Sequence, residues 1–448
     1  MEEPEKSDMK NDAFDEIALE SDVDMSVIDN IARKYSSKPL TKSEGYTLSS
    51  IRDTNGEVAM YVINFADDAG FVVVSATKKY EPILAFSDKG NFNVNDENMP
   101  DGVKQWKIDV VDVINKHKSF PADSALRYAS FWREFEGVRD FVLNRPKTRS
   151  YDYPELDRIM MDSVAIWQSQ GYNVYSLYEN PTTGDSQLDA QIRAYAETSI
   201  LPIYDWQNYS LLLEKEYTNE YVRNNFLKSC WSQTNGFNSY LPYRPDGLAR
   251  AYVGCVILSV AQVMRFFEKP TYSTSFPFHL SNMPYGYAIP ETALFIKDVF
   301  DRFDDKEINN NGTAASIGEA YDVLKSYGYT AKLGDYDKNK VYTNLIQMLP
   351  VIVLGQAGGS GHCWIISGLQ QYVGATEYKL YTFVTDSELS NVFSCETNQS
   401  TSYFFYMSWG WGGLYDGFYG TNYIYNPQSD PDNRVEFTNK RIIYDINY

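Results

Sequence analysis

Cysteine and histidine, the side chains with the most versatile chemistry, are scarce in this 448-residue sequence. It holds only three histidines and four cysteines. They are His117, His279, His362, Cys230, Cys255, Cys363 and Cys395. The cysteine spacing fits no zinc motif, and four cysteines are too few to hold so long a chain together by disulfides. A site that uses either side chain therefore has few candidates.

Long apolar runs and excess positive charge are also missing. No apolar run reaches about 18 residues, so we expect no transmembrane segment. The formal net charge is −20 and no basic block stands out, which argues against nucleic acid and anionic membrane surfaces as partners. Residues 1–20 are acidic and polar, contain no signal peptide, and are expected to be frayed. A chain numbered from after a removed export signal would begin in this way.

The first 120 residues predict a small α+β domain. Hydrophobic residues make up 43% of the chain, enough for two or three domains with real cores. The expected elements of residues 1–120 are helices at 24–36 and 103–117 and strands at 60–65, 70–76 and 82–87. His117 ends the second helix beside lysines, so we expect it to be solvated.

Residues 121–200 predict a mainly helical connecting segment in which proteolytic processing would act. It contains a basic, proline-containing break at 145–150 and a loop at 179–185. Residues 201–448 favour one further α+β domain. Its expected elements are helices at 255–268 and 315–327 and strands at 350–355, 362–369, 378–385, 403–408 and 440–446.

Residues 254–267 predict a buried helix that opens on a cysteine. Gly254 permits a tight turn into the helix, Pro270 closes it, and apolar residues cover nearly its whole circumference. Cys255 would lie among unpaired backbone N–H groups at the positive end of the helix dipole. We expect this setting to lower the pKa of Cys255 toward the thiolate, which is the nucleophilic form.

A glycine-rich stretch at 358–361 leads into a strand that begins with His362. Alternation puts His362 and Trp364 on one face of that strand and Cys363 on the other, so His362 can face a cleft. Taken alone, a hydrogen-bonded histidine at a strand end is the simpler interpretation.

Two further stretches belong to the same pattern. Residues 408–413 read Ser-Trp-Gly-Trp-Gly-Gly, and their tryptophans either pack in a core or shield the imidazole from water. Upstream of the cysteine, the side-chain amide of Gln233 can donate to a developing oxyanion together with the backbone N–H of the nucleophile.

The order of glutamine, helix-start cysteine, glycine-rich histidine and Trp-Gly corner is that of a papain-like cysteine protease. The sequence resembles the streptopain family of bacterial cysteine proteases in particular. The stretches that carry this resemblance are Gly-Cys-Val at 254–256, Ala-Gln-Val-Met at 261–264, Gly-His at 361–362, Trp-Gly-Trp-Gly-Gly at 409–413 and Asp-Gly-Phe at 416–418. Residues 70–75 and 82–87 are similar to the inhibitory prosegment of that family.

The resemblance implies roles for five residues. Cys255 would be the nucleophile, His362 the general base and acid, and Gln233 an oxyanion donor. Trp409 would shield the histidine. Ser408 stands where the family usually has the asparagine that orients the imidazole. A serine hydroxyl can accept the imidazole N–H, but it is shorter and freer to rotate, which leaves the level of activity open.

The resemblance also implies a fold and a function. The fold is papain-like α+β, with a buried nucleophile helix on an antiparallel sheet, preceded by an inhibitory prodomain. The function is that of a secreted cysteine endopeptidase, extracellular, periplasmic or at the cell surface, made as a zymogen. Its partners would be protein or peptide substrates and its own prosegment, and its Cys255 thioester chemistry needs no metal or organic cofactor. Two alternatives stay open: an inactive binding or inhibitory protein on a decayed protease fold, and a transferase or amidase.

The other candidates carry less weight. Asp416 more readily caps a turn than acts in catalysis. Cys230, Cys363 and Cys395 are of a type more often found as small buried hydrophobes, and a Cys230–Cys395 disulfide is left open. His279 lies in a loop rich in proline and phenylalanine, from which it could line the cleft.

Overall fold

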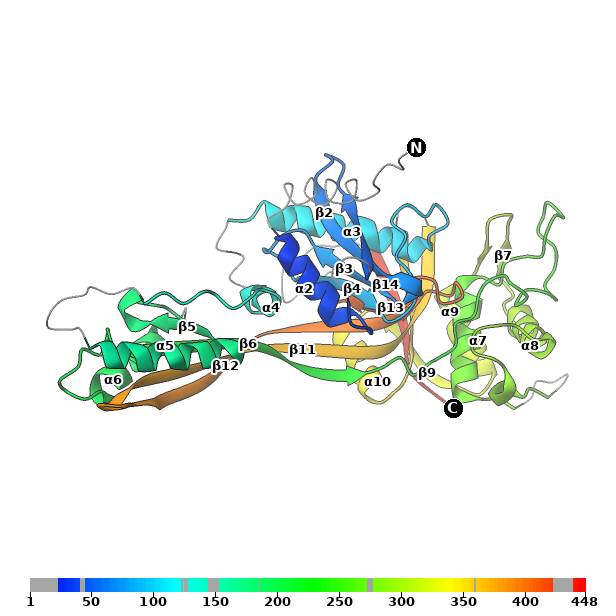
Figure 1. The fold of residues 1–448 in the computed structure, drawn as a ribbon. Coiled ribbons are helices and arrows are strands. Elements are labelled where there is room, and N and C mark those ends of the chain that lie inside the picture. Colours follow the sequence, from blue (N-terminus) through cyan, green and yellow to red (C-terminus); the bar gives the residue numbers. More distant parts are fainter. Residues whose placement is uncertain are drawn as a thin grey trace, which may run out of the picture. The chain divides into compact units, whose positions relative to one another are not determined.

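The structure is a computed structural model that describes residues 23–40, 45–121, 124, 128–143, 153–183, 185–271, 277–357, 360–421 and 438–448. The expected frayed start at 1–20, the basic break at 145–150 and the glycines at 358 and 359 lie outside the described residues. The chain divides into two compact units (Figure 1). The first comprises Met1–Ala122, Glu220–Gln371 and Ser402–Tyr448, and the second comprises Asp123–Asn219 and Tyr372–Thr401.

The first unit begins with a small antiparallel sheet and two helices, which we call the N-terminal domain (residues 23–121). Its elements are α2 (Met25–Tyr35), β1 (Tyr46–Arg52), β2 (Val58–Phe65), β3 (Phe71–Ser75), β4 (Ile83–Ser87) and α3 (Asp101–Lys118). The carboxylate of Asp24 accepts the Ser26 N–H at 3.1 Å and so caps α2. The helices and strands predicted for this domain are confirmed. His117, expected to be solvated, is instead buried, and its Nδ1 lies 2.9 Å from the Lys79 carbonyl.

The sheet of the N-terminal domain continues into the rest of the first unit. Strand β4 pairs antiparallel with β13 (Gly417–Gly420) through Phe86 opposite Phe418 and Ala85 opposite Tyr419. The strand order is β1-β2-β3-β4-β13-β12-β11-β10-β14-β9. The remaining strands are β9 (Thr330–Asp335), β10 (Val351–Ala357), β11 (Ser360–Thr385), β12 (Glu388–Ser408) and β14 (Thr438–Asn447). One edge of the C-terminal sheet is thus covered by the N-terminal domain.

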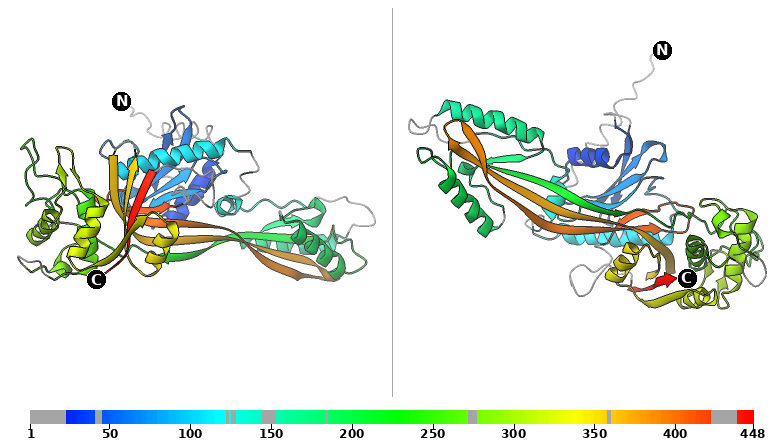
Figure 2. Two further views of the ribbon diagram at one scale, coloured as in Figure 1. Left: turned by 180° about the vertical axis from the view of Figure 1, so that it is seen from behind. Right: turned by 90° about the horizontal axis from the view of Figure 1, so that it is seen from below.

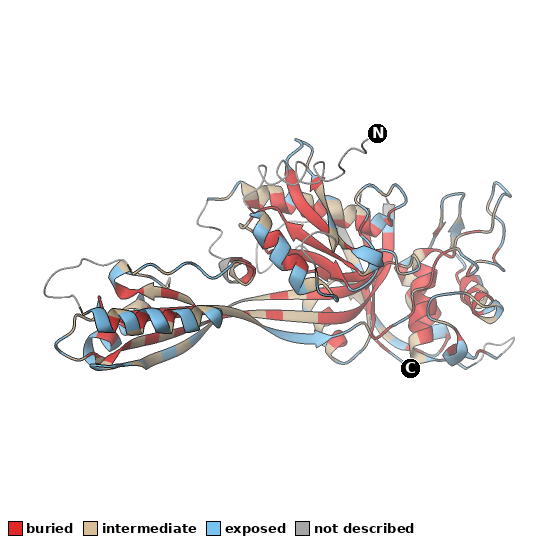
Figure 3. Ribbon diagram, in the orientation of Figure 1, coloured by how far each residue is buried: buried red, intermediate tan, exposed pale blue. Residues whose placement is uncertain are grey.

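The core of the C-terminal region (residues 220–371 and 402–448) forms around α7 (Cys255–Phe267). Every α7 residue from Val256 to Arg265 is buried, as the red ribbon in Figure 3 shows. The Arg265 guanidinium is satisfied by backbone carbonyls, which include that of Met283 at 3.0 Å. The surrounding elements are α8 (Pro290–Asp301), β7 (Glu307–Ile308), β8 (Thr313–Ala314), α9 (Ile317–Ser326) and α10 (Lys338–Ile346).

Residues from β10, β11 and β14 complete the cluster around α7, so the helix packs directly against the antiparallel sheet. The predicted α+β class, a buried helix against such a sheet preceded by a small α+β domain, is confirmed. No helix among the described residues is long and apolar enough to span a membrane.

The second unit combines helices from one chain segment with the strand ends of another. Its elements are α4 (Ala129–Arg133), α5 (Pro154–Ser169), β5 (Asn173–Ser176), α6 (Ser186–Ser199) and most of β6 (Ser210–Arg223). They join residues 372–401, which are parts of β11 and β12. In the right-hand view of Figure 2 the two long helices, α5 and α6, lie on either side of these strands. The strands predicted separately at 362–369 and 378–385 prove to be one continuous strand, β11.

Candidate active site

Cys255 is the first residue of α7, and the local backbone fixes that start. Gly254 has φ 90°, a left-handed conformation that favours glycine. A Cβ atom at this position would lie only 2.6 Å from the carbonyl oxygen of Thr313 in β8. Any other residue here would therefore strain the backbone and push against β8. The position of Cys255 thus depends on the glycine before it.

His362 stands near the start of β11, opposite Gly355 of β10. It is 6% exposed, whereas its neighbour Cys363 turns into the core, where its sulfur lies 3.6 Å from the Ser259 hydroxyl of α7. The predicted alternation of the strand is thus confirmed: His362 stacks with Trp364 on one face while Cys363 packs on the other.

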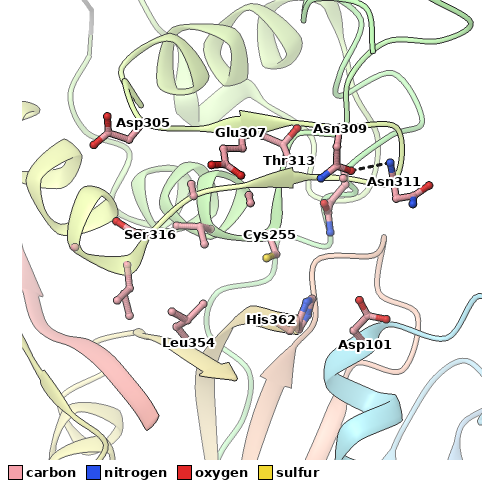
Figure 4. Close-up of a pocket in the computed structure, with 18 of the residues that line it drawn as sticks. Asp101, Cys255, Asp305, Glu307, Asn309, Asn311, Thr313, Ser316, Leu354 and His362 are labelled. Atoms are coloured by element: carbon pink, nitrogen blue, oxygen red, sulfur yellow. Dashed lines mark hydrogen bonds between the residues drawn. The ribbon is translucent and has the colours of Figure 1, made fainter. Parts of the chain in front are cut away.

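Cys255 and His362 line one cavity of about 890 Å³. Figure 4 shows the Cys255 sulfur pointing toward the strand that carries His362. Gln233 lines the same cavity, as do Leu354 and Trp411. The hydrogen bonds of the described residues include none between the Cys255 thiol and the His362 ring. The structure thus gathers the predicted nucleophile, base and oxyanion donor at one cavity without linking the first two directly.

The hydrogen bond at the imidazole determines its tautomer. Nε2 of His362 lies 3.2 Å from the backbone carbonyl oxygen of Trp409. Because a carbonyl can only accept, Nε2 must carry the hydrogen, which leaves Nδ1 as the proton acceptor of the neutral ring. The ring of Trp409 stacks on the imidazole at 6.1 Å between centroids and is 1% exposed, so it excludes water from this bond.

Ser408 does not make the contact expected of it. Its hydroxyl is buried, but it makes no hydrogen bond to His362. It lies instead on the side of Asp416, whose ionised form it favours. Asp416 accepts the Trp409 N–H at 2.8 Å and so closes the turn that presents the Trp409 carbonyl. The orientation of the imidazole in this structure therefore comes from a backbone carbonyl and not from the serine.

Gln233 is held in place by the backbone around it. Its carbonyl accepts the Val253 N–H at 3.1 Å, two residues before the cysteine. The preceding Trp231 N–H donates to the side chain of Gln262 in α7 at 3.1 Å. Ser232 forms a β-bridge with Trp411. These links bind the segment of Gln233 to both the helix and the Trp-Gly turn.

Burial keeps both candidate catalytic groups uncharged. It raises the pKa of the Cys255 thiol, against the opposing effect of the backbone N–H groups of Cys363 and Val256. It lowers the pKa of His362 to about 4. The expectation that the helix start lowers the pKa of Cys255 is wrong for this state, because desolvation outweighs the backbone N–H groups.

The N-terminal domain lies directly on this site. A Cβ atom at Gly102, in the first turn of α3, would stand 2.6 Å from Cδ2 of His362 and 2.6 Å from Cζ3 of Trp409. Asp101 lines the cavity, and its carboxylate favours the protonated forms of both Cys255 and His362, although burial lowers the pKa of His362 overall. The sequence predicts this helix only from residue 103, and it carries no signal for what Asp101 and Gly102 face.

The other candidates lie elsewhere. His279 is 61% exposed and pairs with Glu291 at 2.8 Å, away from the residues that line the cavity. Cys230 and Cys395 are both free thiols. Within the described ranges, no three His, Cys, Asp or Glu side chains are grouped so as to hold a metal ion.

In a comparison with known proteins, the N-terminal domain and the part of the chain around Cys255 match two different families. Residues 25–114 match the Spi protease inhibitor family, and residues 231–288, which contain Gln233 and Cys255, match the Peptidase C10 family. The chain thus matches an inhibitor family in its first part and a peptidase family around Cys255, which confirms the resemblance to streptopain-type proteases and their prosegment.

No curated protein matches the sequence. Among solved structures, a mutant fragment of Prevotella intermedia prointerpain A is similar to this chain, with a TM-score of 0.47 and 16% sequence identity. The likeness covers 89% of this chain and 98% of that one.

Proposed function

We propose that the protein is a cysteine endopeptidase that is made as a zymogen, with Cys255 as nucleophile and His362 as general base and acid. The observation that carries the proposal is that both side chains line one cavity together with Gln233. The Peptidase C10 match over residues 231–288 supports the peptidase class. The family resemblance further supports a location outside the cytoplasm.

The proposed reaction uses groups already placed around the cavity. Nδ1 of His362 takes the thiol proton as the Cys255 sulfur attacks the peptide carbonyl. The Cys255 N–H and the Gln233 amide would stabilise the oxyanion. The imidazolium then donates its proton to the leaving amine, and the neutral ring activates water that hydrolyses the thioester. Trp409 holds the ring angle through both steps by accepting the Nε2 hydrogen.

We propose that the N-terminal domain keeps this site inactive by two means. Its helix α3 covers the imidazole at Gly102, which takes the ring out of water. The Asp101 carboxylate, close enough to raise the pKa of Cys255, opposes formation of the thiolate. Removal of the domain would expose both groups to water, lower the pKa of Cys255 and raise that of His362, and so favour the thiolate–imidazolium pair.

Hydrolysis of casein by the full chain after limited proteolysis tests the proposal. Cys255→Ala and His362→Ala should each reduce cleavage at least about a thousandfold, because both groups are consumed and restored in every turnover. Cys395→Ala, a free thiol of the second unit, is the matched control and should retain full activity.

If the processed protein leaves casein intact, or if Cys255→Ala cleaves it as well as the original chain, the endopeptidase proposal fails. Binding of protein substrates without cleavage would favour the inactive protease fold. Turnover of small amides or acyl donors alone would favour the transferase or amidase.

A further inference from the structure

The segment 153–219 lies between the two family matches, which end at residue 114 and begin at residue 231. By sequence position it could leave with the N-terminal domain or stay with the C-terminal region. The structure makes it part of the second unit together with residues 372–401, which follow the candidate nucleophile and His362 in the chain. The contacts between segment 153–219 and residues 372–401 therefore determine whether the segment is lost or kept when the chain is processed.

Strand β6 forms the centre of this unit. It pairs with β5 on one side, where Asn173–Ser176 lie opposite residues 211–214, and with β11 on the other. Successive residues of β6 enter different apolar clusters: Leu211 and Leu213 enter one, and Leu212 enters the other. A strand that is paired on both edges and buried on both faces is interior structure and not a linker.

Each apolar cluster contains residues from both chain segments. The first joins Leu156, Met160 and Val164 of α5 to Phe383 of β11. The second joins residues of α6 to residues of β11, namely Leu188, Ile192 and Ala196 to Tyr378 and Leu380. Phe383 and Leu380 are both fully buried. Without segment 153–219 these β11 side chains would face water, which is strongly unfavourable for large apolar side chains.

Polar contacts join the same two segments. The Leu201 N–H donates to the Phe383 carbonyl at 3.0 Å. The buried hydroxyls of Ser210 and Thr382 lie 2.7 Å apart. The Tyr204 hydroxyl donates to Asp386 at 2.9 Å. Removal of the segment would take these partners away from residues 382–386, at the end of β11 and in the turn after it.

We propose that segment 153–219 remains in the mature enzyme, which begins N-terminal to Pro154, and that only the N-terminal domain is released. The inference rests on the proposed zymogen and narrows the processing zone of 121–200 to its first part. The second unit then becomes a permanent module of the peptidase, assembled from chain segments on both sides of the nucleophile.

Limited proteolysis of the full chain carrying Cys255→Ala tests the proposal, since this variant cannot process itself and the result does not depend on catalysis. Trypsin has a site within the segment at Arg158, whose side chain is 61% exposed. We expect the stable product, mapped by N-terminal sequencing and intact mass, to begin before residue 154. A nick in the loop at 179–185 should leave both pieces together on native chromatography. A folded, soluble product that lacks residues 154–219 would overturn the proposal.

A matched pair of substitutions in the same background tests the cause. Phe383→Ala removes the β11 side chain from the cluster of α5, and we expect cleavage within 154–219 to become at least about tenfold faster. Ile203→Ala, at a residue that is 67% exposed, should change the rate less than about twofold. If Phe383→Ala does not fold, Phe383→Leu gives the same test with a smaller expected acceleration. Equal cleavage rates in a folded Phe383 variant and the Ile203 variant would contradict the proposal.

Casein cleavage by the active enzyme, compared with the first residue of the stable product, separates failure of this inference from failure of the proposed function. If Cys255→Ala abolishes casein cleavage but the stable product starts after residue 219, the proposed function survives and this inference fails. If the product starts before residue 154 but casein is never cleaved, the inference survives and the proposed catalysis fails.

Discussion

The N-terminal domain and segment 153–219 both precede the candidate nucleophile in the chain, yet different chemistry holds each in place. The N-terminal domain buries titratable groups where it meets the C-terminal region. Ser402 donates to the buried carboxylate of Glu81, and Asp109 lies near Lys440. His362 lies under Gly102. Segment 153–219 meets residues 372–401 through two apolar clusters and through hydrogen bonds, which include one from the Tyr378 hydroxyl to the buried carboxylate of Glu214.

This difference bears on which part we propose is released on processing. Buried titratable groups make an interface sensitive to pH, since each favours one protonation state. Apolar clusters shared between two chain segments carry no such dependence of their own and resemble the core of a domain, so any pH dependence of the second unit comes from its buried carboxylates, Glu214 and Glu216. The following predictions test that contrast, from the largest expected effect to the smallest.

Arg133→Met should destabilise the second unit and leave the candidate active site unchanged. Arg133 donates at 2.9 Å to both Glu214 and Glu216, whose side chains are 8% and 4% exposed. Loss of the partner of buried carboxylates should cost about 2–3 kcal/mol, at the lower end for such pairs because Arg133 is itself 37% exposed. Denaturant unfolding measures this cost, and the alkylation rate of Cys255 serves as the local control.

The sign of the pH dependence checks the cause of that effect. Burial raises the pKa of Glu216 to about 7. The neutral form of Glu216 therefore contributes stability that is lost as pH rises through 7. Because a neutral Glu216 has less need of a cationic partner, the cost of Arg133→Met should shrink below about pH 6. Arg158→Met, which breaks solvent-exposed ion pairs with Glu155 and Asp162, should cost far less than Arg133→Met at any pH. A cost of Arg133→Met that is independent of pH would contradict this account.

The hold of the N-terminal domain should weaken as pH falls from about 6.5 to 4. The pKa of His362 is lowered to about 4, so its contribution is present above the ordinary value and lost as pH falls through the folded one. The full effect is on the order of 3 kcal/mol. Asp109 acts in the opposite sense, because burial raises its pKa to about 6 and its contribution is lost as pH rises through that value.

Thermal unfolding of Cys255→Ala, with and without His362→Phe, isolates the histidine. The other titratable groups are common to both chains, so the difference between their midpoints should shrink toward acid pH. Midpoints that stay parallel from pH 7 to pH 4 would show that His362 does not titrate in this interface.

Gly102→Ala should loosen the N-terminal domain and raise the activity of the unprocessed chain about tenfold. The added methyl group would stand 2.6 Å from both His362 and Trp409, an overpacking cost of about 1–2 kcal/mol. Helix propensity cannot explain such a loss, because alanine is favoured over glycine in a helix. Gly137→Ala, where a Cβ atom meets nothing within 4 Å, is the matched control. Unchanged activity in Gly102→Ala would contradict the contact.

Asp101→Asn should have the smallest effect, an increase of about twofold to fivefold in Cys255 alkylation at pH 7. The carboxylate raises the pKa of Cys255, so its neutralisation increases the thiolate fraction. Asp112→Asn changes the same charge further along α3 and should leave the rate unaltered. Equal alkylation rates in both variants would show that Asp101 does not help to keep Cys255 unreactive.

Much of the candidate site can be predicted from local sequence. Gly254 and the apolar run behind Cys255 define a buried helix start, and the two-residue period of β11 determines that His362 and Cys363 face opposite ways. The roles of these residues stay proposals, but their local geometry follows from neighbours in the chain.

What the sequence does not predict depends on contacts between distant segments. The cover of His362 by Gly102 follows from the pairing of β4 with β13, and apolar strands carry little information about which edge they will join. The polar residues Gln370 and Gln371 interrupt the apolar pattern, so β11 looks like two strands although its backbone pairing continues. His117 looks solvated beside lysines, yet Tyr80 and Phe120 enclose its ring.

The alkylation rate of Cys255 before and after removal of the N-terminal domain tests the central claim most directly. A thiol-directed epoxide at pH 6, followed by peptide mapping, reports all four thiols of the chain at once. We predict that Cys255 reacts at least about a hundredfold faster after removal, that His362→Ala abolishes this gain, and that Cys363 and Cys395 show no gain. A Cys255 that stays unreactive after removal, or that reacts equally in the intact chain, would contradict the account.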